Sequence, residues 1–185
     1  KLDSYEIKDN CIKDKTNKQI TKIINEKVNI NSPFQSMDLY MVDGVFISVK
    51  NLKNISCRFK GDYVPEGCFF GCEDLEEVIL RDINNIEPYA FHKCKKLKKI
   101  TIYSAPPILK LNKKLLNTPD YNTPVVIPTL KFQSCSLGSL AHDCLIDIPF
   151  PTELKFEKGF LNENSNSNIK IRVSGILINI KDIIV

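Results

Sequence analysis

The sequence of 185 residues has little of what several large classes of protein require. No apolar run approaches the roughly 18 residues of a membrane-spanning helix, and the most apolar stretch, residues 169–185, is interrupted by four charged side chains. Arginine occurs three times against 23 lysines, so the bidentate guanidinium groups that grip phosphate are few. The net charge of +4 is mild. We therefore expect no membrane span and regard a nucleic-acid partner as disfavoured.

Side chains for metal and catalytic chemistry are also scarce. The two histidines lie 50 residues apart and no cysteine pair has the C-x-x-C spacing, so we expect no metal or cofactor. Seven cysteines leave at least one thiol unpaired in a monomer. His142, Asp143 and Cys144 are consecutive, whereas a nucleophile and its base must converge from separate elements. No catalytic residue is therefore predicted.

A 22-residue repeat occupies the middle of the chain. Residues 64–80 align with residues 86–102 at a constant offset of 22, and residues 41–57 fit at an offset of 23. Seven positions hold apolar residues or cysteine in all three copies. They are Val64, Cys68, Phe69, Cys72, Leu75, Val78 and Leu80; then Ile86, Ala90, Phe91, Cys94, Leu97, Ile100 and Ile102; and, upstream, Met41, Val45, Phe46, Val49, Leu52, Ile55 and Cys57.

The spacing within one unit predicts its local structure. Cys68, Phe69, Cys72 and Leu75 lie at i, i+1, i+4 and i+7, which is typical of one face of a short helix. Val78 and Leu80 alternate as in a short strand. Because one such unit cannot bury its own apolar face, we expect the copies to stack into a solenoid with a parallel sheet.

Downstream of Ile102 the repeat is degenerate. Ile108 falls one period after Ile86, and we expect a short helix containing Leu111, Leu115 and Leu116. A loop over residues 117–124 and a strand over residues 125–127 are expected to follow. A last unit is predicted over residues 154–173. In it Phe160, Ile169 and Ile171 take the places of Phe69, Val78 and Leu80. Strands over residues 169–173 and 176–180 flank Ser174-Gly175.

The pattern F-x-x-C-x-x-L-x-x-I-x-L resembles the BspA-like class of leucine-rich repeats. Ala105-Pro106-Pro107-Ile108, followed by Val126-Ile127-Pro128, is similar to the final repeats of that class. The resemblance implies an α/β fold, a right-handed leucine-rich-repeat solenoid with a parallel β-sheet on one face, short helices on the other and a β-rich C-terminal end. It also implies binding of a protein or surface glycan at the cell surface or in a secreted protein, without catalytic residues.

The repeat divides the chain into three parts. Residues 1–40 are predicted to be an N-terminal flank or cap, with a helix over residues 18–28. Residues 41–128 hold the leucine-rich repeats, with a period of 22–23. Residues 129–185 form a degenerate repeat and a β-rich C-terminal cap that shields the open end of the solenoid.

The outward face of the predicted sheet is the candidate binding surface. Strand alternation turns three columns outward: Asn54/Glu77/Lys99, Ser56/Ile79/Thr101 and Arg58/Arg81/Tyr103. Arginine and tyrosine are enriched in interaction hot spots. The candidate binding residues are accordingly Arg58, Glu77, Ile79, Arg81, Lys99 and Tyr103. An ordinary solvated sheet face is the alternative for these positions. For the whole chain, the alternative is a structural subunit held in a larger assembly through its end faces.

Two further features have competing interpretations. Cys72 and Cys94 occupy the same position in adjacent repeat units. They could form a ladder of buried thiols, a disulfide or a metal site. Residues 92–99 contain five lysines. This lysine run is either a solvated turn on the convex side of the solenoid or a binding site for an anionic partner.

Overall fold

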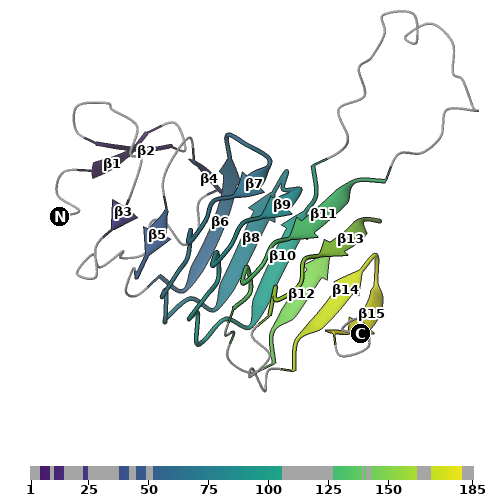
Figure 1. Ribbon diagram of the computed structural model, residues 1–185. Helices are drawn as coiled ribbons and strands as arrows, with labels where there is room; N and C mark the ends of the chain where they lie inside the picture. Colours follow the sequence, from purple (N-terminus) through teal and green to yellow (C-terminus); the bar gives the residue numbers. More distant parts are fainter. Residues whose placement is uncertain are drawn as a thin grey trace, which may run out of the picture.

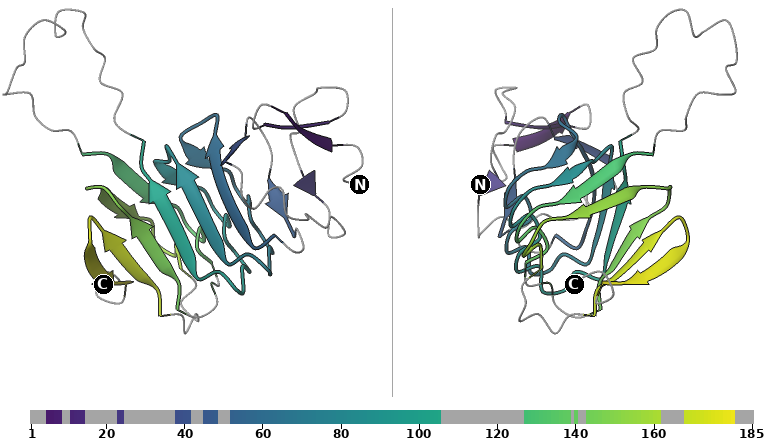
Figure 2. Two further views of the ribbon diagram at one scale, coloured as in Figure 1. Left: turned by 180° about the vertical axis from the view of Figure 1, so that it is seen from behind. Right: turned by 45° about the vertical axis from the view of Figure 1, so that its right-hand side comes forward.

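In the computed structural model the description covers residues 45–48, 52–105, 127–138, 140, 143–161 and 168–180, together with the strand positions of residues 5–8, 11–14, 23–24 and 38–41. Two sheets extend along the molecule as adjacent layers (Figure 1; Figure 2 shows them from behind and obliquely). The larger sheet has nine strands in the order β1-β2-β4-β6-β8-β10-β12-β14-β15, and the smaller has four in the order β13-β11-β9-β7.

The nine-stranded sheet is parallel from β2 to β14 and antiparallel at both ends. The strands of this sheet are β1 (Tyr5–Lys8), β2 (Cys11–Asp14), β4 (Asp38–Met41), β6 (Asn54–Phe59), β8 (Glu77–Arg81), β10 (Lys99–Tyr103), β12 (Leu145–Ile148), β14 (Lys170–Val173) and β15 (Ile176–Asn179). Those of the smaller sheet are β7 (Tyr63–Val64), β9 (Asn85–Ile86), β11 (Thr129–Phe132) and β13 (Glu153–Phe156). A separate pair is formed by β3 (Ile23–Ile24) and β5 (Phe46–Ile47).

Each turn of the chain contributes one strand to the nine-stranded sheet (a long strand) and then one to the four-stranded sheet (a short strand, although β12 and β13 are equal in length), so the molecule is a parallel β-solenoid of about four turns. The offset of 22 or 23 residues is confirmed, because Val78 pairs with both Ile55 and Ile100. Phe46, Phe69 and Phe91 stack one above another in the core, with ring centroids 5.6 and 5.2 Å apart. All three rings are fully buried. The repeated apolar positions therefore form one continuous core.

The predicted short helices are wrong: within the described part of the repeats, the segments that connect β7 to β8 and β9 to β10 are successive turns. Some amide groups in them bond to the carbonyl three residues earlier, as Cys72 N–H does to Phe69. Others bond to the next turn of the solenoid, as Phe69 N–H does to the carbonyl of Ala90 at 2.8 Å.

Positive φ angles explain why no helix propagates there. Gly67 and Tyr89 are equivalent residues with φ of 62° and 58°, and Gly71 and Lys93 repeat the pattern four positions later at 69° and 62°. A left-handed residue every fourth position ends each helical turn. The spacing that we assigned to a helix is the spacing of these turns.

The register downstream of Tyr103 also differs from the prediction. Ile100 pairs with Ile146 in β12, at an offset of 46 residues, and the partner of Ile86 in the smaller sheet is Phe132 and not Ile108. The helix predicted from Ile108 and the loop predicted over 117–124 lie outside the described residues. Of the strand predicted over 125–127, only Ile127 is described, and it precedes β11. An insertion inside one turn of the solenoid therefore breaks the period.

The last predicted unit exists with a shifted register. Ile171 pairs with Ile146, so Ile171 takes the place of Val78, and Val173 that of Leu80. The Phe160 carbonyl accepts a hydrogen bond from Leu137 N–H, just as the Ala90 carbonyl accepts one from Phe69 N–H. Phe160 therefore takes the place of Ala90, which is the place of Cys68 in the turn before. The C-terminal hairpin is confirmed, with positive φ at Ser174 and Gly175, as a two-residue type I′ turn requires.

At the N-terminal side two expectations fail. Ile23–Ile24, inside the helix predicted over residues 18–28, is strand β3, whose β-branched residues pair with Phe46–Ile47. Met41 was aligned with Val64 of the smaller sheet, yet it ends β4 of the larger sheet and pairs with Phe59. Met41 is therefore out of the repeat register, whereas Phe46 and Ile55 keep it.

Cys72 and Cys94 are buried thiols that form no disulfide, which confirms the interpretation of this column as a buried thiol ladder. Cys72 Sγ donates to the Phe46 carbonyl at 2.7 Å, and Cys94 Sγ donates to the Phe69 carbonyl at 3.1 Å. Burial raises the pKa of Cys94 well above its ordinary value, and the neighbouring Cys72 adds to the rise. Burial also raises the pKa of Cys144 to about 12. These thiols are poor nucleophiles because the thiolate is suppressed.

We expect Cys72 and Cys94 to be reduced and unreactive in the folded protein. Each thiol is buried and bonded to a carbonyl, whereas Cys135 is partly exposed and should be alkylated first. Alkylation of the native and the denatured protein without reductant, followed by peptide mass spectrometry, measures both states. A peptide linked through Cys72 and Cys94 would contradict the expectation.

Candidate functional site: the exposed face of the nine-stranded sheet

Three strands bring the predicted site residues into register. Arg58 pairs with Arg81, and Arg81 with Tyr103, so these side chains form one row across β6, β8 and β10, which we call the cationic–aromatic row. Ser56, Ile79 and Thr101 form the next row, and Asn54, Glu77 and Lys99 the third. The strands hold the rows in place because their alternate side chains, among them Val78 and Leu80, are buried in the core.

The cationic–aromatic row is held by specific contacts. The Arg81 guanidinium carbon lies 4.9 Å from the centroid of the Tyr103 ring, a cation–π arrangement of about 0.5–1 kcal/mol at an exposed site. Arg58 Nε lies 2.8 Å from a carboxylate oxygen of Asp82. The two adjacent guanidinium groups are thus each given a separate neighbour, which offsets their mutual repulsion.

Phe150, after β12, extends this row. Its ring lies 6.0 Å from that of Tyr103, and the residue is 61% exposed. The sequence analysis missed Phe150 because the insertion conceals the register of β12. Its only signal in the sequence is an aromatic residue two positions beyond the apolar alternation of Ile146 and Ile148.

The middle row departs from the prediction at Thr101, which was expected to point into solvent and is only 8% exposed. Its register neighbours are Ile79 on one side and Asp147 on the other, and they shield it. Ile79 itself is half-buried, so it remains part of the surface.

Asp147 and Arg172 form a bidentate ion pair across β12 and β14. Arg172 donates from Nε and Nη2 to the two carboxylate oxygens of Asp147 at 2.9 and 2.7 Å. These bonds hold the pKa of Asp147 below its ordinary value, and Lys99, whose Nζ lies 3.9 Å away, lowers this pKa further. Lys99 sits beside Glu77 in register, as predicted, and its ammonium also reaches toward Asp147.

An Arg172→Met variant should raise the pKa of Asp147 toward or above its ordinary value. A depressed carboxyl pKa stabilises the fold above the unfolded-state value of about 3.9, and the contribution is lost as the pH falls through the folded-state pKa. The difference in unfolding free energy between wild type and variant should therefore be constant from neutral pH to about 5 and shrink below about 4. Carboxyl NMR titration with denaturation at several pH values measures both effects. An unchanged Asp147 pKa in the variant would contradict this account.

Three lysines of the run lie in the segment that precedes β10, where their ammonium groups meet acidic residues of the preceding turn. Of the other two, Lys93 lies over the Phe70 ring and Lys99 begins β10. Lys95 Nζ lies 2.6 Å from Glu73, Lys96 2.8 Å from Asp74 and Lys98 2.8 Å from Glu76, each at the repeat offset. The bond from Lys98 lowers the pKa of Glu76. The run is thus a ladder of exposed ion pairs, which weakens its interpretation as a site for an anionic partner.

Across the described ranges, His, Cys, Asp and Glu form no group of three that could hold a metal ion. Among those same residues there is also no helix with the length and apolar character to cross a membrane. The exposed face combines guanidinium, aromatic and aliphatic groups with the charged side chains of Glu77, Lys99 and Asp147, and aromatic residues and arginine are enriched in protein interfaces.

Comparison with known proteins agrees with the repeat geometry. The chain matches the model of the BspA type leucine rich repeat region in six copies, over residues 6–135 and 39–164. No curated protein and no solved structure matches the chain at a significant level. The family match extends beyond residues 41–128 in both directions. The match covers more than half of the chain, so the chain belongs to the BspA-type leucine-rich repeat family.

Proposed function

We propose that the chain is a non-catalytic interaction module that binds a partner protein through the exposed face of the nine-stranded sheet. Leucine-rich repeats typically serve in protein interaction. The contact residues would be Arg58, Ile79, Arg81 and Tyr103, with Phe150 at the edge, while Glu77 and Lys99 would form the polar rim.

The cationic–aromatic row is the observation that carries this proposal. It combines two arginines and two aromatic rings on a rigid surface, and arginine and tyrosine are enriched among residues that dominate binding energy. These side chains stand outside the stacked core, so their arrangement is not needed to fill it. A partner with carboxylates beside an apolar group would complement this row, and a surface glycan would use the same aromatic rings. A role in adhesion at the cell surface is consistent with either partner.

The alternative of a structural subunit held through its end faces has one observation in its favour. At the C-terminal end Ile127 and Ile176 are 50% and 69% exposed. An assembly subunit should be oligomeric or insoluble on its own, whereas an interaction module should be a monomer. Light scattering of the isolated chain distinguishes the two.

A cross-linking experiment tests the proposed contact surface. A photoreactive amino acid replaces Tyr103 in one variant and Lys95, in the lysine ladder, in its matched control. After irradiation with the extract that contains the partner, mass spectrometry should identify one species linked through position 103 and little through position 95. Cross-links concentrated at position 95 would contradict the proposal.

A further inference from the structure

We propose that the free edge of β13 is a second interaction site, where an extended segment of a partner protein adds as one more strand of the four-stranded sheet. This site lies at the C-terminal end of the solenoid and is separate from the cationic–aromatic row. Such strand addition gains affinity from main-chain hydrogen bonds and specificity from alternate side chains.

None of the described residues is hydrogen-bonded to the backbone groups on the outer edge of β13. Glu153 N–H donates to the Pro128 carbonyl and Glu157 N–H to the Phe132 carbonyl, so the odd-numbered residues face β11. Because successive peptide groups of a strand point in opposite directions, the N–H and C=O groups of Leu154 and Phe156 face away from β11. Among the described residues, no strand follows β13 in its sheet.

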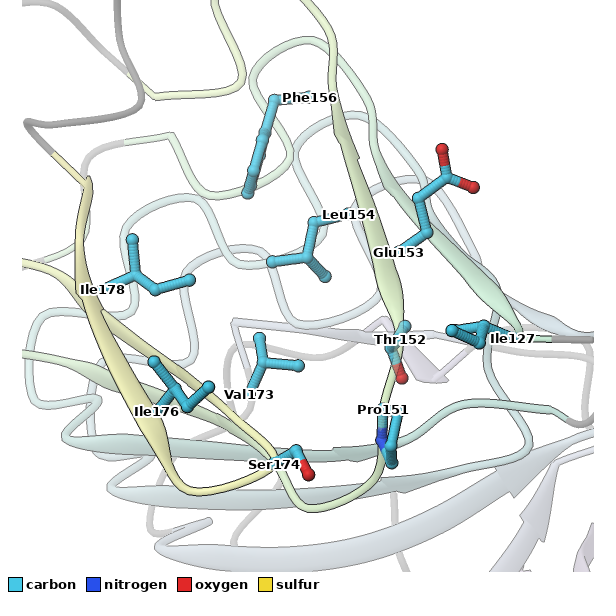
Figure 3. Close-up of a pocket in the computed structure, with 10 residues that line it drawn as sticks. All are labelled: Ile127, Pro151, Thr152, Glu153, Leu154, Phe156, Val173, Ser174, Ile176 and Ile178. Carbon is cyan, nitrogen blue, oxygen red and sulfur yellow. The ribbon is translucent and has the colours of Figure 1, made fainter. Parts of the chain in front are cut away.

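Apolar side chains form a hollow next to this edge (Figure 3). Leu154 and Phe156 point from β13 toward Ile176 and Ile178 of β15, and Val173 forms the floor between them. The cavity has a volume of about 860 Å³. A strand added at β13 would direct alternate side chains into this hollow. Leu130 and Phe132 of β11 are buried in the core in the same way.

The topology favours a single strand over a second copy of the solenoid. β15 already extends the nine-stranded sheet one strand beyond β14, while the four-stranded sheet stops at β13. The position of the next long strand is therefore filled, and that of the next short strand is open. A second solenoid stacked on this end would bring a long strand into the place that β15 occupies.

Charges on the outward side of β13 specify the partner further. Neighbouring turns join their polar side chains across the short strands, as Thr129 does with Glu153 at 2.8 Å and Lys131 with Glu157. Glu153 and Lys155 form an ion pair with each other at 3.8 Å, and both side chains remain more than half exposed to a further strand. An added strand would thus carry a basic residue opposite Glu153, an acidic residue opposite Lys155 and apolar residues opposite Leu154 and Phe156.

A capped peptide of sequence TKIEIKT tests the proposal with the full chain. Its pattern reads the same in both directions, so it serves parallel and antiparallel addition alike. We expect saturable binding, with NMR shift changes confined to β13, β15 and the hollow. A peptide of the same composition without the alternation should not bind. Failure of TKIEIKT to bind up to its solubility limit, or shift changes centred on the cationic–aromatic row, would overturn the proposal.

Two variants make the test specific. Ile176→Asp should abolish peptide binding without unfolding the chain, because this side chain is 69% exposed. The charge-reversed peptide TEIKIET should bind wild type roughly tenfold more weakly and regain affinity for the Glu153→Lys, Lys155→Glu double variant. Equal affinity of wild type and Ile176→Asp for TKIEIKT would refute the site.

The same variants distinguish binding of a partner strand at β13 from self-association of the chain and from binding at the cationic–aromatic row. If the isolated chain dimerises and Ile176→Asp abolishes the dimer, the occupant is a second copy and the proposal is overturned. An Arg81→Glu variant should bind the peptide as wild type does. The two proposed surfaces can therefore fail independently.

Discussion

Replacing Phe91 by alanine is expected to lower the free energy of unfolding by about 3–5 kcal/mol, the usual cost of removing a buried phenylalanine side chain. Phe91 is fully buried, and its ring stacks on Phe69 at a centroid distance of 5.2 Å and an interplanar angle of 11°. The cavity would open between two turns, so it would weaken the contact that joins them. In a repeat protein that contact supports the adjoining turns as well.

Denaturation by urea measures this loss, thermal denaturation measures the melting temperature, and circular dichroism follows both. Phe70→Ala is the matched control, since Phe70 neighbours Phe69 in sequence but lies outside the stack, half-buried against His92. The control should lose clearly less stability than Phe91→Ala. A Phe91→Ala protein that melts within about two degrees of wild type would show that the stacked register is wrong, because a loss of 3–5 kcal/mol shifts a domain of this size by several degrees at least.

The stacked core could be predicted from the sequence because its signal is periodic. Phe46, Phe69 and Phe91 recur at 23 and 22 residues, and one ring must lie above the next whatever the local backbone does. The conformation between strands was not predictable in the same way. The N–H of Tyr89, which lies in the left-handed region, donates to the Cys135 carbonyl of the next turn, and apolar spacing does not reveal such a bond.

The insertion between Tyr103 and Thr129 explains the errors downstream of Tyr103. Period counting assumes that each turn has the same length, so it assigned Ile108 to the place that Phe132 takes. The register of the candidate site, which lies upstream of the insertion, was predicted correctly, because Arg58 pairs with Arg81 and Arg81 with Tyr103. The Asp147–Arg172 pair and Phe150, which lie beyond it, were not found. The boundaries at residues 40 and 128 stay a prediction.

The variant Arg81→Glu with Ile79→Asp is expected to abolish binding of the partner through the proposed face. Arg81 stands at the centre of the cationic–aromatic row, between Arg58 and Tyr103, and Ile79 is its nearest outward neighbour on β8. Truncating an anchor of this kind often costs about 2 kcal/mol or more, and reversing its charge adds repulsion. The melting temperature should change little, because the core residues Val78 and Leu80 are untouched and a carboxylate beside Arg58 is electrostatically favourable.

Lys95→Glu with Lys96→Glu is the matched control, since it also reverses charge at the surface of the same repeats. These lysines pair with Glu73 and Asp74 in exposed positions, where each ion pair contributes about 0–1 kcal/mol. Their replacement should reduce the association rate at low salt and leave the affinity nearly unchanged at physiological salt. Surface plasmon resonance at two salt concentrations separates the two effects. If the lysine changes abolish binding and the sheet-face changes do not, the contact surface is the lysine ladder, because only groups in the interface determine the dissociation rate at high salt.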